Sequence, residues 1–206
     1  MNNSYYLIRH GQTDWNLAGR WQGNADIPLN ATGKSQAAAI AARLATRPIK
    51  AIYSSPLSRA AETAAAIAQL HQLPIQFEPD LRERNAGIFE GLTRDDIERD
   101  YPASFEQMKH GIMIPPEGET SESIQARAVP IVKRIIADHP ADSVVIVSHG
   151  GTIGAIIAHL LNLPLKDSHR YSIYANCALT RVENTQRGLR LMQLNDTGHL
   201  EQLLNG

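Results

Sequence analysis

A short β-branched run, Ser143–Ser148 (Ser-Val-Val-Ile-Val-Ser), most strongly limits the fold that this chain can adopt. Continuous apolar runs of this kind are typical of strands that are buried on both faces of a parallel sheet. The run stops at His149, Gly150 and Gly151, and an apolar helical pattern resumes over Thr152–Leu161. Parallel strands need crossover connections, which are usually helices. The run therefore predicts an α/β fold.

The start of the chain repeats this order of strand, histidine and glycine. Tyr5–Ile8 is a run of strand-forming residues, and Arg9, His10 and Gly11 follow it. Ligands of open α/β folds bind beyond the carboxyl ends of the strands, so His10 and His149 are expected to meet in one crevice. An arginine can bind two phosphate oxygens at once, and an imidazole nitrogen can attack phosphorus. An isolated Arg-His pair is usually a surface cation beside a core histidine, but the repeated order favours a functional pair.

Helical patterns and further strands alternate along the chain. Apolar residues recur at helical spacing in three segments, and two short apolar runs between them predict strands. We expect Pro130 to kink the last of these helices or to mark where it starts again. Residues 15–30 and the tail Asn195–Gly206 are predicted to be loop. The predicted helices are Thr32–Leu44, Leu57–Leu70 with Ser55 as its cap, and Ser121–Asp138, and the predicted strands are Ile49–Tyr53 and Leu73–Phe77.

Two segments depart from this alternation. Ile173–Glu183 and Leu189–Leu194 predict a hairpin, and hence an antiparallel edge strand on the parallel sheet. Residues 85–120 predict an insertion over the site, with a short helix over Thr93–Asp100. The apolar side chains of this insertion predict a lid or, as the safer interpretation, a small separate core (Phe89, Phe105, Met108, Ile112 and Met113).

Two more charged residues are candidates for the same crevice. Arg59 falls in the first turn of a predicted helix, where backbone amides favour anions and a cation is mildly unfavourable. A bound anion would explain it, although a solvated arginine is the commoner reason for such a residue taken alone. Glu83 stands between Arg82 and Arg84, which would ordinarily indicate a surface charge cluster.

Composition excludes several classes of protein. The formal net charge is -1, which gives no broad basic surface for nucleic acid or an anionic membrane. One cysteine, Cys177, excludes a disulfide framework within the chain. The first residues lack the basic and apolar regions of a signal peptide, and no apolar run approaches the ~18 residues of a membrane-spanning helix. We therefore expect a soluble, cytoplasmic protein.

Six motifs in order, over roughly residues 5 to 200, resemble the histidine phosphatase superfamily, in the branch that includes cofactor-dependent phosphoglycerate mutases and their phosphatase relatives. The resemblance adds to the α/β prediction. We expect a single domain over residues 1–206, a three-layer sandwich with a mostly parallel central sheet, one antiparallel edge strand, helices on both faces and a small lid insertion. The motifs are Arg9-His10-Gly11 with Asn16, Gly23…Asp26…Pro28-Leu29…Gly33, Ser54-Ser55-Pro56-Leu57…Arg59-Ala60…Thr63, Leu81…Glu83…Gly87…Glu90-Gly91, Pro116…Gly118-Glu119-Thr120, and Val147-Ser148-His149-Gly150-Gly151.

The resemblance implies a role for each charged residue of the crevice. His10 is the expected nucleophile, which forms a phosphohistidine. Arg9, Arg59 and His149 are expected to surround the three equatorial oxygens of the phosphoryl group, where positive charge stabilises the transition state.

Neutral donors and an acid complete the expected site. Asn16, Gln22 and the amide of Gly150 are expected to contact phosphate oxygens. Glu83 is expected to protonate the leaving oxygen and later to take a proton from the attacking water. Cations lower the pKa of a carboxyl, whereas a general acid needs a raised pKa. We therefore expect the two neighbouring arginines to point away from Glu83, and the carboxyl to lose part of its solvation when substrate binds.

A metal site is the rival explanation for two converging histidines. Glu83 would complete its ligands, but Arg9 and Arg59 would repel a cation. We expect no metal and no cofactor. The exception is a phosphoglycerate mutase, for which the resemblance implies 2,3-bisphosphoglycerate.

The insertion separates the two enzyme classes. The resemblance implies a basic, substrate-clamping lid in the mutases, and here the basic residues of the insertion are few (Arg94, Arg99, Lys109 and His110). The sequence therefore favours a metal-independent phosphatase of small phosphomonoesters over a mutase. A phosphate-binding protein without turnover is a third alternative, which the complete set of site residues disfavours. The expected partner is a small phosphomonoester substrate rather than nucleic acid or membrane, and a homodimer is left open.

Overall fold

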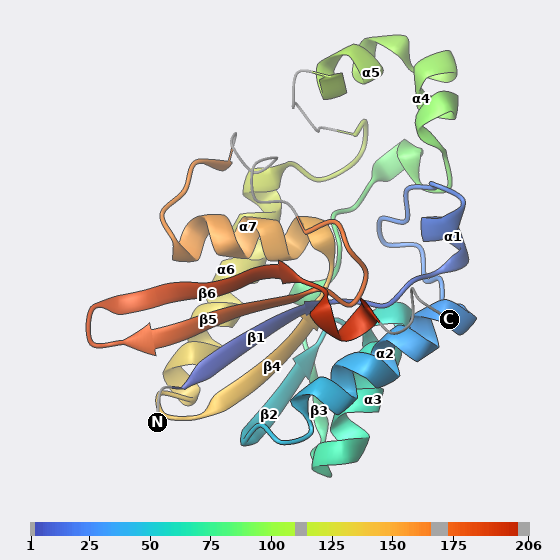
Figure 1. The fold of residues 1–206 in the computed structure, drawn as a ribbon. Coiled ribbons are helices and arrows are strands. Elements are labelled where there is room, and N and C mark those ends of the chain that lie inside the picture. Colours follow the sequence, from blue (N-terminus) through green and yellow to red (C-terminus); the bar gives the residue numbers. More distant parts are fainter. Residues whose placement is uncertain (1–2, 110–114, 166–172, 202–206) are drawn as a thin grey trace.

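The chain folds around one central sheet. The computed structural model describes residues 3–109, 115–165 and 173–201. Six strands lie in the order β3-β2-β4-β1-β5-β6 (Figure 1). Neighbours from β3 to β1 pair in parallel, whereas β5 is antiparallel to β1 and to β6. The predicted mostly parallel sheet with an antiparallel edge is confirmed. The strands are β1 (Ser4–Arg9), β2 (Ile49–Ser54), β3 (Ile75–Phe77), β4 (Ser143–Ser148), β5 (Leu179–Thr185) and β6 (Gly188–Asp196).

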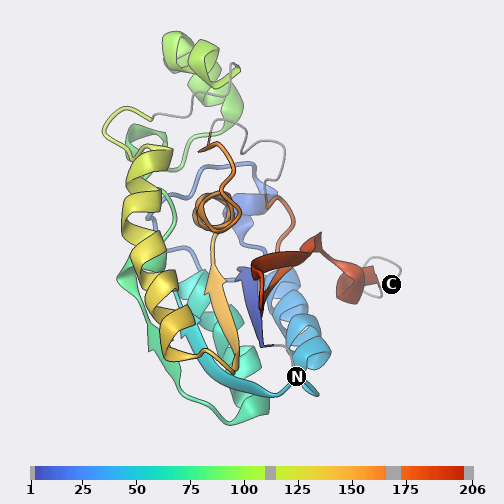
Figure 2. The same cartoon turned by 90° about the vertical axis from the view of Figure 1, so that its left-hand side faces the viewer.

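Helices cover both faces of the sheet, as predicted for a three-layer sandwich (Figure 2). Alternate side chains of a strand point to opposite faces. In β1, Tyr5 and Leu7 pack into the core beneath α6 and α7, whereas Tyr6 and Ile8 pack into the core beneath α2 and α3. The covering helices are α2 (Ala31–Leu44), α3 (Ser58–His71), α6 (Ser121–Asp138) and α7 (Gly150–Leu160).

The apolar stripes of these helices lie where the sequence predicts them. The buried residues of α2 include Ala37, Ile40, Ala41 and Leu44. α6 continues through Pro130 as one helix instead of starting again there. Pro130 lies on the exposed side of α6, so the carbonyl that loses its helical partner there can be hydrated.

Three predictions from the sequence differ from the structure. The predicted loop 15–30 begins inside a short helix, α1 (Asp14–Leu17), whose first turn is closed by a capping box. The predicted strand Ile173–Glu183 begins later in the structure. β5 starts at Leu179, so residues 173–178 are not part of it. The expected loose tail instead forms the turn Gly198–Leu200, whose Leu200 is buried in the core beneath α2 and α3. Residues 202–206 of that tail lie outside the described part of the chain.

The insertion carries its own small core beyond the carboxyl ends of the strands (Figures 1 and 2). α4 (Arg94–Asp100) matches the predicted helix, whereas α5 (Pro102–Lys109) was not predicted. Phe89, Ile97 and Phe105 are buried together and Met108 packs against them, which confirms the prediction of a separate core. The other two predicted members of this core, Ile112 and Met113, lie outside the described residues. Among the helices that the structure describes, none is both long and apolar enough to span a membrane.

Two glycines let the loop after β1 meet the first turn of α2. A Cβ added at Gly33 would lie 2.0 Å from the carbonyl oxygen of Gln12, and one added at Gly11 would lie 2.6 Å from that of Gly33. Both obstacles are backbone atoms. We expect Gly33→Ala to lower the free energy of unfolding by about 1–3 kcal/mol, because a packed backbone must shift.

Urea unfolding of the Gly33→Ala variant measures this loss. Gly154→Ala in α7 is the matched control, because a Cβ there meets nothing within 4 Å outside its own helix. That control should keep or raise stability through helix propensity. An unchanged midpoint for Gly33→Ala would contradict the close approach.

Candidate active site

The two predicted histidines meet at the carboxyl ends of neighbouring strands. β1 and β4 pair in parallel up to Arg9 and Ser148, and the next residue of each strand is a histidine. The ring centroids of His10 and His149 are 5.1 Å apart. Their exposed fractions are 3% and 0%. The parallel register thus brings into contact two rings that are far apart in the sequence.

The surroundings of His10 determine which ring nitrogen is free. Its Nδ1 lies 2.7 Å from the carbonyl oxygen of Gly11. A carbonyl only accepts hydrogen bonds, so Nδ1 carries the proton. Burial, together with the charges of Arg9 and Arg59, holds the pKa of His10 well below its usual 6.5. The ring is therefore neutral near pH 7, with an unshared electron pair on Nε2.

His149 is fixed by partners on both ring nitrogens. Arg59 Nε donates to His149 Nδ1 over 3.3 Å, and His149 Nε2 is 2.8 Å from the hydroxyl oxygen of Ser55. Burial first, and then the charge of Arg59, lowers the pKa of His149 well below 6.5. The prediction that Ser55 caps the following helix is wrong: α3 begins at Ser58, with Leu57 as a cap that makes no side-chain bond.

Arg59 is a fully buried cation in the first turn of α3. Its Nη1 and Nη2 donate to the carbonyl oxygens of Ala25 and Gly23, over 2.7 and 2.8 Å. Burial lowers the pKa of the guanidinium to about 10, so it stays protonated at neutral pH. An arginine has five N–H donors. With these two bonds and the one to His149 in place, donors remain for a ligand.

Arg9 is the second arginine of the site and directly precedes His10. Its Nη1 donates to the carbonyls of Ile173 and Tyr174. Its Nε is buried and finds no acceptor among the residues that the structure describes. Burial lowers the pKa of Arg9, while the Glu83 carboxylate opposes this shift. A Cβ added at Gly150 would lie 3.7 Å from this Nε, so the start of α7 and an unsatisfied donor face the same space.

Asn16 and Gln22 join the site through Thr13. The Thr13 hydroxyl is 3.0 Å from Gln22 Oε1, and it accepts the backbone N–H of Asn16 over 3.1 Å. Asn176 then connects Asn16 to His10: its Nδ2 donates over 3.2 Å to Asn16 Oδ1 and over 3.2 Å to the carbonyl oxygen of His10. Sequence reasoning missed Asn176, because it lies in a segment predicted as plain strand.

Glu83 lies at the start of α7. Its carboxylate accepts the backbone N–H groups of Gly151 and Thr152, each over 3.2 Å. The guanidinium groups beside it bond elsewhere, as expected. Arg82 Nε donates to the carbonyl of Pro79, and Arg84 Nη2 donates to the Ser121 hydroxyl over 3.0 Å.

Arg127 of α6 fastens the backbone around Glu83. Its guanidinium donates to the carbonyl oxygens of Asp80, Arg82 and Glu83, over 2.6, 2.9 and 3.0 Å. Its remaining donors bind both carboxylate oxygens of Glu119, over 2.8 and 2.9 Å. Five acceptors thus match five donors, which holds the acid-bearing loop against α6. No sequence signal identified Arg127.

The site therefore combines a neutral imidazole, two arginines, helix-start amides and one carboxylate. A metal site is the alternative explanation for the two histidines. Across residues 3–109, 115–165 and 173–201, no group of three or more His, Cys, Asp or Glu side chains is placed to hold a metal ion.

Comparison with known proteins decides the family. The family model of the histidine phosphatase superfamily (branch 1) matches residues 5–197. The chain belongs to this superfamily. The resemblance inferred from the six sequence motifs is thereby confirmed.

Relatives within the superfamily include two phosphatases and one mutase. Glucosyl-3-phosphoglycerate phosphatase of Mycobacterium tuberculosis is 37% identical over 185 residues, which are 85% of this chain and 83% of the relative. A metal-independent phosphoserine phosphatase of Arabidopsis thaliana is 40% identical and covers 73% of this chain and 65% of the relative. A probable phosphoglycerate mutase, GpmB, of Yersinia pestis is 33% identical over 95% of this chain and 94% of the relative.

The fold agrees with the sequence comparison. A solved mycobacterial glucosyl-3-phosphoglycerate phosphatase in complex with VO3 superposes with a TM-score of 0.87 and 31% identity. The match covers 95% of this chain and all of the other chain. Membership of the superfamily and the named phosphatases together support hydrolysis of phosphomonoesters, as the sequence predicted.

Proposed function

We propose that this histidine phosphatase hydrolyses small phosphomonoesters through a phosphohistidine on His10, without a metal ion. The observation that carries the proposal is the state of His10. A neutral ring, protonated on Nδ1 by its bond to Gly11, offers Nε2 to a phosphorus atom. The charges of the partly buried Arg9 and the fully buried Arg59 act on this ring.

In the first step, Nε2 of His10 attacks phosphorus while the bond from phosphorus to the ester oxygen breaks. Arg9 and Arg59 bind the non-bridging oxygens and offset their charge. Asn16, Gln22 and the N–H of Gly150, which opens α7, are proposed as the neutral donors. Glu83, which is proposed to take up a proton as its carboxyl loses solvation on substrate binding, gives that proton to the leaving oxygen, so the alcohol departs uncharged.

In the second step, water attacks the phosphohistidine. Glu83, now a carboxylate, takes a proton from this water as the bond from phosphorus to nitrogen breaks. Inorganic phosphate forms, and the neutral ring of His10 returns. His149 is proposed to bind a phosphoryl oxygen with the Nε2–H that faces Ser55 in the free site, while Arg59 fixes the ring through Nδ1.

The insertion supports a phosphatase over a mutase. Its described cations are bound within the insertion itself. Arg94 stacks over Phe105 at 5.0 Å, and Arg99 pairs with Asp96 and Asp100. Lys109 pairs with Glu106, a residue of its own helix. A mutase needs cations that reach the substrate carboxylate, yet GpmB-like relatives keep the mutase as the second candidate. We propose residues 85–120 as a lid of the single domain.

The test is phosphate release at pH 5 to 8 in the presence of a chelator. The substrates are p-nitrophenyl phosphate, phosphoserine, 3-phosphoglycerate, a glucosylated phosphoglycerate and several sugar phosphates. We expect release that is unchanged by chelation, because His10 and the arginines replace metal chemistry. The rank order of substrates would identify the alcohol.

Two results would contradict the proposal. Loss of phosphate release on chelation would show that the reaction needs a metal ion. Absence of release, with phosphoglycerate interconversion only after 2,3-bisphosphoglycerate is added, would identify a mutase.

A further inference from the structure

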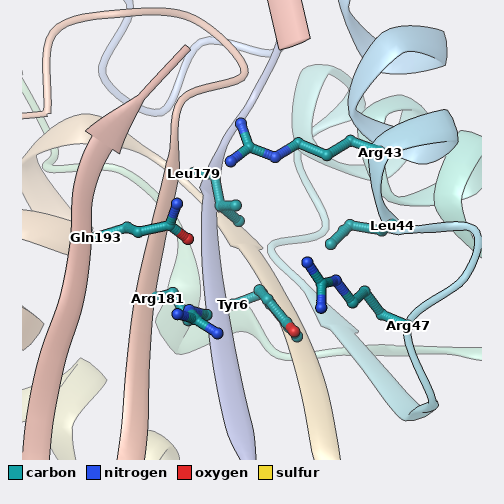
Figure 3. Close-up of a pocket in the computed structure, with 7 residues that line it drawn as sticks. All are labelled: Tyr6, Arg43, Leu44, Arg47, Leu179, Arg181 and Gln193. Atoms are coloured by element: carbon teal, nitrogen blue, oxygen red, sulfur yellow. The ribbon is translucent and has the colours of Figure 1, made fainter. Parts of the chain in front are cut away.

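A second cluster of arginines surrounds a small pocket on the α2 side of the sheet. Arg43 and Arg47 come from the end of α2 and the turn after it, and Arg181 comes from β5 (Figure 3). Tyr6 of β1 and Gln193 of β6 line the same pocket, and Leu44 and Leu179 complete it. The volume is about 100 Å³. This is far below the 300–1,000 Å³ typical of pockets for drug-sized ligands, so only a small group fits.

One buried donor of the pocket lacks an acceptor. Tyr6 lines the pocket and is only 4% exposed. In Figure 3 the side chains of Tyr6 and Arg47 extend toward each other. Arg47 is exposed and makes no ion pair with any residue of the described ranges, whereas Nε of Arg181 is buried without a partner there. Buried polar groups are normally satisfied, so Nε of Arg181 points to an absent acceptor, and the exposed Arg47 lines the same pocket.

Charge indicates the sign of that acceptor. Arg43 pairs with Asp196 at 2.5 Å, and Arg181 pairs with Glu183 at 3.0 Å. Two carboxylates thus face three guanidinium groups, which leaves one positive charge in excess. Guanidinium and phenol groups are donors that suit tetrahedral oxyanions.

We propose that this pocket is a second site for a phosphate group, separate from the catalytic pocket. Tyr6 stands four residues before His10 in the chain, which is roughly 13 Å along a strand. The ligand is inorganic phosphate or the phosphate of a small ester whose remainder extends past exposed Arg47. Phosphate binding in this second pocket does not depend on the proposed catalytic role of His10.

Backbone-amide NMR of the full chain, titrated with inorganic phosphate at physiological salt, tests the proposal. We expect two independent sets of shifts: one at Gly11 and Gly150, and one around Leu44, Arg181 and Gln193. Arg47→Ala should weaken binding at the second set roughly tenfold, as loss of a charge-assisted bond does. The first set should keep its affinity.

Arg187→Ala is the matched control, because Arg187 is also exposed but lies in the β5–β6 turn. It should leave both sets unchanged. Tyr6→Phe removes one hydroxyl and should weaken the second set alone. Methylphosphonate, which cannot be hydrolysed, takes the place of a phosphate ester. Shifts of the second set that are equal with methylphosphonate and with phosphate indicate an ester ligand. Shifts with phosphate alone indicate the free ion. Two results overturn the proposal. In the first, no second set of shifts appears. In the second, neither Arg47→Ala nor Tyr6→Phe weakens phosphate binding at that set.

Discussion

Replacement of His10 by alanine is expected to lower phosphate release by at least about 10³-fold for every substrate. The imidazole of His10 is the group that we propose forms the covalent bond, and the chain places no other free nucleophilic nitrogen beside Arg9 and Arg59 among its described residues. Removal of a nucleophile costs factors of this size or more, because the rest of the site only binds and orients. Initial rates with p-nitrophenyl phosphate measure the loss.

Phosphate affinity distinguishes lost chemistry from lost structure in the His10→Ala variant. Arg9, Arg59 and the start of α7 remain in it, so inorganic phosphate should still bind with an affinity near that of the unaltered chain. Acid quenching of the unaltered enzyme during turnover should trap an acid-labile phosphoryl group, and His10→Ala should trap none. Full activity of His10→Ala would remove the phosphohistidine mechanism.

Glu83→Gln is expected to convert hydrolysis of p-nitrophenyl phosphate into a single burst. Nitrophenolate leaves without a proton, so His10 should still be phosphorylated at a substantial rate. The following water attack lacks its base, and general base catalysis supplies typically 10²–10⁴-fold. Stopped-flow absorbance should therefore record about one equivalent of nitrophenolate per enzyme, followed by a steady state that is slower by roughly that factor.

Phosphoserine provides the contrasting substrate for Glu83→Gln. Its alkoxide needs a proton to leave, so both steps slow and no burst of serine should be seen. Glu98→Gln, an exposed carboxyl of α4, controls for the loss of a negative charge and should behave as the unaltered enzyme. A burst with both substrates would assign the acid role to another group.

Periodicity predicted the elements that carry the site. The stripe of α2 is readable because its apolar residues repeat with the helical period, and β4 is readable because a continuous β-branched run is typical of a strand buried on both faces. The two histidines were placed together correctly, since parallel strands share one edge. What failed depends on partners far along the chain. Serine is a common residue at helix caps, yet the hydroxyl of Ser55 bonds to His149, 94 residues away. A local pattern contains no information about such a partner.

The supporting residues were the least predictable. Asn176 and Arg127 act through backbone carbonyls, and any residue type supplies a carbonyl. The sequence therefore does not indicate which loop Asn176 or Arg127 holds. The tail after Asn195 has the composition of a flexible end, but Arg43 binds its Asp196 and Leu200 is buried. Docking of that kind depends on the shape of the surface that receives it.

The central position of β1 has a consequence for the order in which the protein is made. β1 leaves the ribosome first, but its parallel partner β4 is synthesised about 140 residues later. At 5–20 residues per second, the interval is on the order of ten seconds. During that time the apolar strand that ends at His10 lacks both of its neighbours, since β5 follows later still. Phosphate affinity should therefore arise late and abruptly on a nascent chain, and the exposed strand is the segment that most needs protection by a chaperone.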